Sequence, residues 1–132
     1  MMRPTRLRAY PTFDDAVGMC HEGTLLPVHR RILADTETPV SAFMKIQAED
    51  TYGFLLESVE GGENVARYSF LGVDPFLVFS ARADQSTAHN RRTGDTDQRD
   101  GDPVGHLREL LDRYRGVHID DLPRFSGGAV GY

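Results

Sequence analysis

The sequence has a single cysteine, Cys20, so it forms no disulfide bond within the chain. Structural disulfides belong to oxidising compartments, and their absence predicts a cytoplasmic protein. The chain also lacks any apolar run near the roughly 20 residues that a membrane-spanning helix needs. The N-terminal stretch MMRPTRLRAY is basic but is not followed by an apolar segment, which argues against a signal peptide.

Several common signatures of function are missing as well. There is no GxGxxG, Walker loop, HExxH, CxxC pair or GxSxG. The net charge is −5, from 15 basic and 20 acidic residues, and the N-terminal basic cluster of Arg3, Arg6 and Arg8 is interpreted as a solvated tail. Nucleic-acid binding would require a clustered basic face. The sequence therefore predicts neither a nucleic-acid partner nor a membrane partner.

The composition is that of a soluble globular protein. Hydrophobic residues make up 39% and charged residues 27% of the 132 residues. A chain of this length suits one domain, here residues 1–132. Such a domain can bury roughly two-thirds of the surface that its unfolded chain exposes.

Three segments have helical signals. Thr12 followed by acidic residues predicts a helix that stops near Gly23, with one apolar face made by Phe13, Ala16, Val17 and Cys20. Cys20 on that face is expected to be a small buried hydrophobic residue. Thr38 and Pro39 predict a helix over residues 39–47, with Val40, Phe43, Met44 and Gln47 on one face, although SAFMKI also alternates partly, as a strand would. Pro103 opens a third helix that ends at Gly116, with a face of Val104, Leu107, Leu110, Leu111 and Tyr114.

The strand signals are short and closely spaced. GFLLESV, ARYSFLGV and PFLVFSA predict an antiparallel meander of three strands. Leu25–Leu33 contains Pro27 and predicts an edge strand or an extended segment. Residues 84–102 have Ala88 as their one apolar side chain, which predicts an exposed hairpin around Thr93-Gly94-Asp95 or a mobile loop. The final residues, 125–132, are expected to begin a further strand that the chain cuts short. The predicted class is α+β: an antiparallel sheet with flanking helices.

One stretch, LLES, places polar side chains at the end of a predicted apolar strand. The buried strand ends on Glu57 and Ser58, and Arg67 opens the next strand. A carboxylate and a guanidinium held close together could bind a zwitterion. They could also form an ion pair with each other and bind no ligand, and chemistry alone favours this second alternative. Adjacent strand residues point to opposite faces, so Glu57 and Ser58 are poor candidates for a base and its nucleophile.

Three stretches give the chain a resemblance to a known family. LLPVHRRILADTETPVSAFMKI, FLLESVEGGENVARYSFLGVDP and PRFSGGAVGY occur in the order and at roughly the spacing found in the N-terminal domain of anthranilate synthase component I, a chorismate-utilising enzyme. Together they cover most of the chain outside the N-terminal tail and residues 84–102. The combination is specific, whereas LLES alone would not be.

The resemblance implies a function for this part of the sequence. The family converts chorismate to anthranilate and pyruvate in tryptophan biosynthesis, as a lyase that uses Mg²⁺ in a C-terminal domain and ammonia from a glutamine amidotransferase partner, component II. Its N-terminal domain contributes to the feedback site for L-tryptophan. By this resemblance Glu57 and Ser58 contact L-tryptophan, Glu57 at the ammonium and Ser58 where a larger side chain would block binding. Arg67 matches a basic position near the ligand.

The resemblance also sets limits. The catalytic C-terminal domain has no counterpart here, so no catalytic or metal-binding residue is predicted in this chain, no cofactor is expected in it, and the chain alone is expected to be inactive. Two alternatives stay open. One is a non-catalytic module that binds tryptophan or a partner. The other is a fragment of the sister enzyme, aminodeoxychorismate synthase component I, although TPVSAFMKI favours anthranilate synthase.

Overall fold

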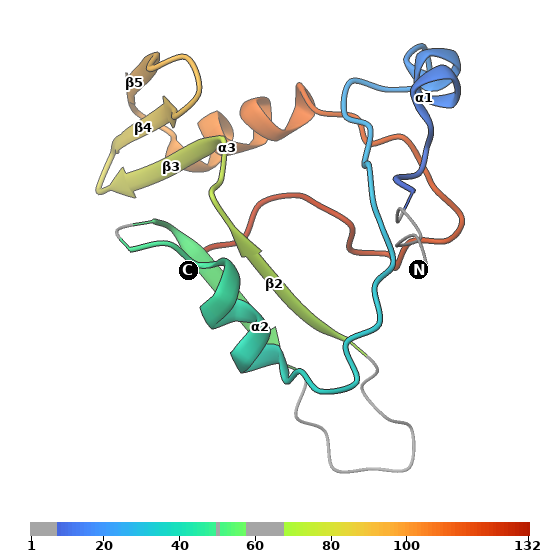
Figure 1. The fold of residues 1–132 in the computed structure, drawn as a ribbon. Helices are drawn as coiled ribbons and strands as arrows, with labels where there is room; N and C mark the ends of the chain where they lie inside the picture. The colour runs from blue at the N-terminus through green and yellow to red at the C-terminus, as the bar shows by residue number, and fades with distance from the viewer. Residues whose placement is uncertain (1–7, 50, 58–67) are drawn as a thin grey trace, which may run out of the picture. The chain divides into compact units, whose positions relative to one another are not determined.

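The computed structural model describes residues 8–49, 51–57 and 68–132. These residues form helices and antiparallel strands in the order α1, α2, β1 to β5 and α3 (Figure 1), which confirms the α+β class. They belong to two compact units: the chain up to Leu33 together with Val104–Tyr132, and Ala34–Pro103. Across the described ranges, no helix is both long enough and apolar enough to cross a membrane.

Helix α1, Phe13–Met19, begins where the sequence predicts and ends earlier. The Thr12 hydroxyl accepts a hydrogen bond from the Asp15 N–H at 3.3 Å, and the Asp15 carboxylate accepts one from the Thr12 backbone N–H at 3.4 Å. This reciprocal cap fixes the first turn. The helix ends at Met19, well before Gly23.

The predicted apolar face of α1 does not pack. Phe13 is 82% exposed and Val17 59% exposed, and no residue of the helix is buried. Cys20 is exposed too, with its Sγ 3.1 Å from the Ala16 carbonyl oxygen. The prediction of a buried Cys20 is therefore wrong. Helical spacing gathers apolar side chains on one face, but burial requires another element to cover that face.

A short clamp joins distant parts of the first unit. The Arg115 carbonyl accepts hydrogen bonds from the N–H groups of Thr24 and Leu25 at 2.8 and 3.1 Å, and the Val117 N–H donates to the Leu25 carbonyl at 2.8 Å. The Thr24 hydroxyl donates to the Arg113 carbonyl at 3.0 Å and accepts from the Arg115 N–H at 2.8 Å. These bonds hold residues 24–25 against 113–117, next to the buried side chain of Val117. The segment from Leu25 is extended, as predicted, and pairs through isolated bridges rather than as a full strand.

The end of the chain differs from the sequence prediction. Helix α3, Pro103–Asp112, starts as expected at the proline but ends before Gly116. Its buried residues are His106 and Leu110, whereas Val104 on the predicted face is 65% exposed. Residues 125–132 form no strand, so that prediction is wrong in this structure. A strand needs a neighbour for its backbone groups, and glycines do not supply side-chain packing to fix one.

In the second unit, helix α2, Pro39–Ile46, packs on a two-stranded sheet of β1, Gly53–Glu57, and β2, Ser69–Val73 (Figure 1). Thr38 and Ser41 cap the helix reciprocally, and Pro39 occupies its first turn, as predicted. A Cβ on Gly53 would lie 3.0 Å from the Phe43 ring, so the face of β1 that contains Gly53 is the one that α2 covers.

The remaining strands form a separate antiparallel sheet: β3, Leu77–Arg82, β4, Gln85–Asn90, and β5, Thr96–Asp100. The polar stretch is thus a hairpin, which confirms the first of its two predicted forms. Only two small residues of β4, Ser86 and Ala88, are buried, so the strand needs no large apolar side chain.

The predicted three-stranded meander is right for its first pair, since β1 and β2 are antiparallel, and wrong for its third strand, because β3 pairs with β4 and not with β2. A sharp turn separates β2 from β3: Asp74 has φ 53°, and its carboxylate accepts a hydrogen bond from Arg91 at 2.7 Å. Arg91 also donates its backbone N–H to the Phe76 carbonyl at 2.8 Å. Arg91 thus holds the loop before β3 against the end of β4. No local signal in the sequence indicates this contact.

The two-residue turn between β3 and β4 gives a first prediction. Ala83 has φ 54°, a left-handed conformation that costs a residue with a Cβ about 1–2 kcal/mol. Glycine removes that cost but has more unfolded-state freedom, worth about 0.4–1 kcal/mol. We therefore expect Ala83→Gly to raise the free energy of unfolding by about 0.5–1 kcal/mol. Urea unfolding followed by circular dichroism measures this, and an unchanged or lower midpoint contradicts it.

Candidate functional site

The structure describes one of the three residues predicted to bind a ligand. Glu57 is the last residue of β1, and its side chain is exposed. Ser58 and Arg67 lie outside the described residues, so the predicted Glu57–Arg67 pairing stays a prediction. The register of the sheet places Glu57 opposite Ser69, the first residue of β2.

The face on which Glu57 lies follows from the strand period. Side chains two apart share a face, so Glu57, Leu55 and Gly53 lie on one side of β1, the side that α2 covers at Gly53. Their partners on β2, namely Val73, Leu71 and Ser69, share that side. Phe54 lies on the opposite side, where a Cβ on Gly72 would come within 2.5 Å of its ring.

The carboxylate of Glu57 is exposed at the end of β1. Among the described residues, its carboxylate takes part in no hydrogen bond or ion pair. A second acid, Glu37, instead pairs with Lys45 and accepts a hydrogen bond from the Ser41 hydroxyl at 2.7 Å. The Lys45 ammonium and then the Ser41 hydroxyl hold the pKa of Glu37 below its usual value. Lys45 of α2 is thereby paired with Glu37, which lies just before the helix.

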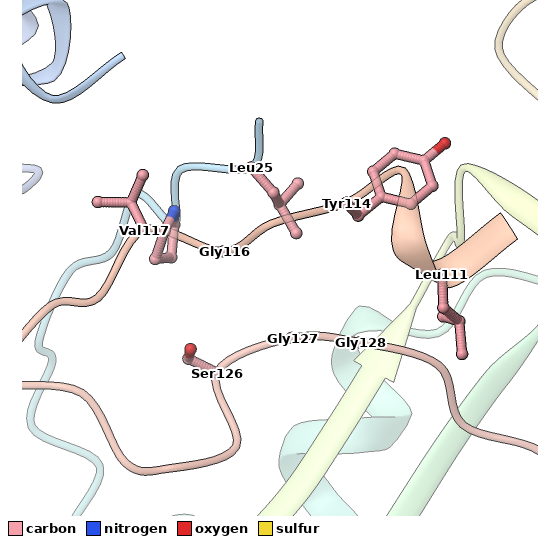
Figure 2. Close-up of a pocket in the computed structure, with 9 residues that line it drawn as sticks. Leu25, Leu111, Tyr114, Gly116, Val117, Ser126, Gly127 and Gly128 are labelled. Atoms are coloured by element: carbon pink, nitrogen blue, oxygen red, sulfur yellow. The ribbon is translucent and has the colours of Figure 1, made fainter. Parts of the chain in front are cut away.

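A pocket of about 250 Å³ lies in the first unit (Figure 2). Its walls are mostly apolar side chains and bare glycine backbone: Leu25, Pro27, Leu111, Tyr114, Gly116, Val117, Ser126, Gly127 and Gly128. The Leu25 side chain extends toward the Ser126–Gly128 segment. The lining contains no carboxylate, histidine or lysine, so this pocket offers shape and apolar contact rather than acid–base chemistry.

A second pocket of the same unit, about 280 Å³, is more polar and is lined by Tyr10, Met19, His118, Ile119, Asp120 and Asp121. His118 Nε2 lies 3.2 Å from an Asp120 carboxylate oxygen, and Arg31 lies 3.8 Å from Asp121. All four of these side chains are largely exposed. Within the described ranges, no group of three or more histidine, cysteine, aspartate or glutamate side chains could hold a metal ion.

Comparison with known proteins identifies the chain. It is 42% identical over 123 residues to anthranilate synthase component 1 of Acetivibrio thermocellus, and 43% identical over 121 residues to that of a Synechocystis strain. It is 44% identical over 110 residues to the protein of the same name in Acinetobacter calcoaceticus. These matches cover 93%, 92% and 81% of the chain, but only 24%, 24% and 22% of the relatives. No family model matches, and no solved structure matches significantly.

The chain spans about a quarter of the length of these relatives, in their N-terminal part. The proteins that it matches are all named anthranilate synthase component 1, and the chain is similar to their N-terminal part. The predicted resemblance is confirmed.

Proposed function

We propose that the chain is the N-terminal region of an anthranilate synthase component 1 and carries part of a site for L-tryptophan. The observation that carries this proposal is the identity of 42–44% to proteins of that name over 81–93% of the chain. The names of these relatives favour anthranilate synthase over aminodeoxychorismate synthase.

The activity proposed for the whole protein follows from the family. It converts chorismate to anthranilate and pyruvate, with Mg²⁺ and chorismate held in a domain beyond this segment, and component II supplies ammonia. None of those steps is assigned to the residues of this chain. Its proposed role is regulatory, since an amino acid that binds at the end of β1 can control activity elsewhere in the protein.

The polar end of β1 supports the regulatory role. A zwitterionic amino acid requires an acceptor for its ammonium, and the exposed Glu57 carboxylate, which bonds to no other described residue, provides one. Ser58 is proposed to leave room for the ligand, and Arg67 to contact its carboxylate.

Titration of L-tryptophan into the purified 132-residue chain tests this function. The chain contains no tryptophan, so the fluorescence of the added ligand is the only indole signal in the sample and reports binding directly, alongside calorimetry. We expect saturable binding that Ser58→Phe weakens at least about tenfold, because the larger side chain fills the space that the ligand uses.

The matched control is Ser80→Phe, which alters an exposed serine on β3 in the other sheet and should leave the affinity unchanged. Circular dichroism must show that each variant is folded. Equal affinity of Ser58→Phe and the unsubstituted chain would remove Ser58 from the site. A folded chain that does not bind L-tryptophan would contradict the proposal that this region forms the site.

A further inference from the structure

We propose that β5 docks a second copy of this chain, whose own β5 pairs with it antiparallel about a two-fold axis at Gln98. Strand β5 has β4 on one side, and no strand of the described residues pairs with its other side, so it is the outer strand of its sheet (Figure 1). An open edge presents backbone groups to which another strand can bond. The inference goes beyond the proposed function, because β5 and β1 lie in different sheets.

The backbone groups that β5 directs outward follow from its bonds to β4. At one end the Asp95 carbonyl accepts the Asn90 N–H at 2.8 Å, and at the other the Gly101 N–H donates to the Asp84 carbonyl at 2.7 Å. Bonded positions recur at every second residue of an antiparallel pair, so the odd-numbered residues between these ends bond to β4. The even-numbered residues therefore direct their N–H and C=O groups to the open edge: Thr96, Gln98 and Asp100.

A second copy of β5 satisfies this edge in a two-fold arrangement. With Gln98 opposite Gln98 of the second copy, their outward N–H and C=O groups bond to each other. Thr96 then lies opposite Asp100 of the second copy, and their outward groups bond in the same way. The strand contains no proline, so each of these residues has an N–H to donate. The backbone of β5 is thus complementary to itself.

The charges of β5 fit the same arrangement. Asp97 and Arg99 lie two residues apart on one face of the strand, and the Arg99 guanidinium lies 2.9 Å from the Asp97 carboxylate. In the two-fold pairing, Asp97 of each copy lies opposite Arg99 of the other. This position has no backbone bonds, so the Cα atoms are about 4.5 Å apart and the side chains are at their closest. The ion pairs of the two copies therefore form one network of alternating charges.

Neighbouring registers of the same strand oppose like charges. A shift by two residues places either Asp97 opposite Asp97 or Arg99 opposite Arg99, and a parallel pairing in register does both. Like charges directly opposite each other destabilise a strand pair. Charged side chains usually protect an open edge from pairing, but in β5 they permit the two-fold register and disfavour its neighbours. Charge complementarity thus identifies a second copy as the partner.

Sedimentation equilibrium of the full 132-residue chain over a series of concentrations tests this proposal. The paired strand has 5 residues, so the interface is small, and we expect a reversible dimer with Kd on the order of 100 µM. Gln98 is exposed and can be replaced without disturbing packing. Gln98→Glu and Gln98→Lys each place like charges on the two-fold axis, and each should raise Kd about fivefold. An equal mixture of these two variants places opposite charges there and should restore the dimer.

The matched control is Ser80→Glu, which adds a charge at an exposed position of β3, on the opposite edge of the same sheet, and should leave Kd unchanged. Circular dichroism must show that each variant is folded. A chain that stays monomeric up to about 1 mM overturns the proposal. So does a dimer that Gln98→Glu does not weaken, or that the mixture of the two charged variants does not restore, because position 98 then does not face its own copy.

Discussion

Replacing Gly23 by alanine is expected to lower the free energy of unfolding by about 3 kcal/mol, the largest effect of any single change considered. A Cβ at this position would lie 2.4 Å from the Arg115 carbonyl oxygen and 3.0 Å from a Val117 methyl carbon. That carbonyl accepts the N–H groups of both Thr24 and Leu25, so it cannot move away without loosening the clamp. The backbone atom leaves no flexible side chain to absorb the clash.

Gly116→Ala is the matched control for Gly23→Ala. Gly116 lies in the same clamp, but a Cβ there meets no atom within 4 Å. We expect its unfolding free energy to stay within about 0.5 kcal/mol of the unsubstituted chain. Urea unfolding monitored by circular dichroism measures both variants. Similar midpoints for the two variants would show that the close approach of the Arg115 carbonyl to Gly23 does not determine the stability of the first unit.

Gly72→Ala is expected to cost about 2 kcal/mol, because the added Cβ meets the ring of its cross-strand neighbour. That Cβ would lie 2.5 and 2.8 Å from two ring carbons of Phe54. Gly72 and Phe54 are paired in the register of β1 and β2. The Phe54 ring therefore occupies the space that a side chain at position 72 would need.

A double-mutant cycle with Phe54→Ala isolates this contact. Phe54→Ala alone removes the half-buried ring and destabilises the sheet. In that background Gly72→Ala has no ring to meet, and we expect its cost to fall below about 0.5 kcal/mol. Additive costs, measured by urea unfolding, would mean that the glycine is needed for a reason other than the Phe54 ring.

Local chemistry in the sequence was sufficient for the starts of the helices and for the polar hairpin. Thr12 and Thr38 each accept a hydrogen bond from the first turn of a helix, and Pro103 begins α3, because caps and prolines act within a few residues of themselves. The turn residues around Gly94 likewise allow β4 to fold back on β5.

The candidate site was only partly readable from the sequence. LLES predicted a polar end to a buried strand; Glu57 does end β1, but no residue of that strand is buried, so the burial part of the prediction is wrong. The position of Ser69 opposite Glu57 could not be predicted, because it depends on the register between two strands, which is set by the pairing and not by either segment alone. The resemblance to a family, and not the chemistry of the residues, suggested L-tryptophan as the ligand to test.

The sequence by itself determined the α+β class, the helix starts and the family, since these depend on residue types at short spacing or on the chain as a whole. Only the tertiary structure decided that β3 leaves β2 for β4, that Cys20 is exposed, and that Glu57 faces Ser69. The physical reason is the same in each case. Strand partners and burial depend on contacts between residues far apart in the chain, and a one-residue change in pairing moves every side chain to the other face.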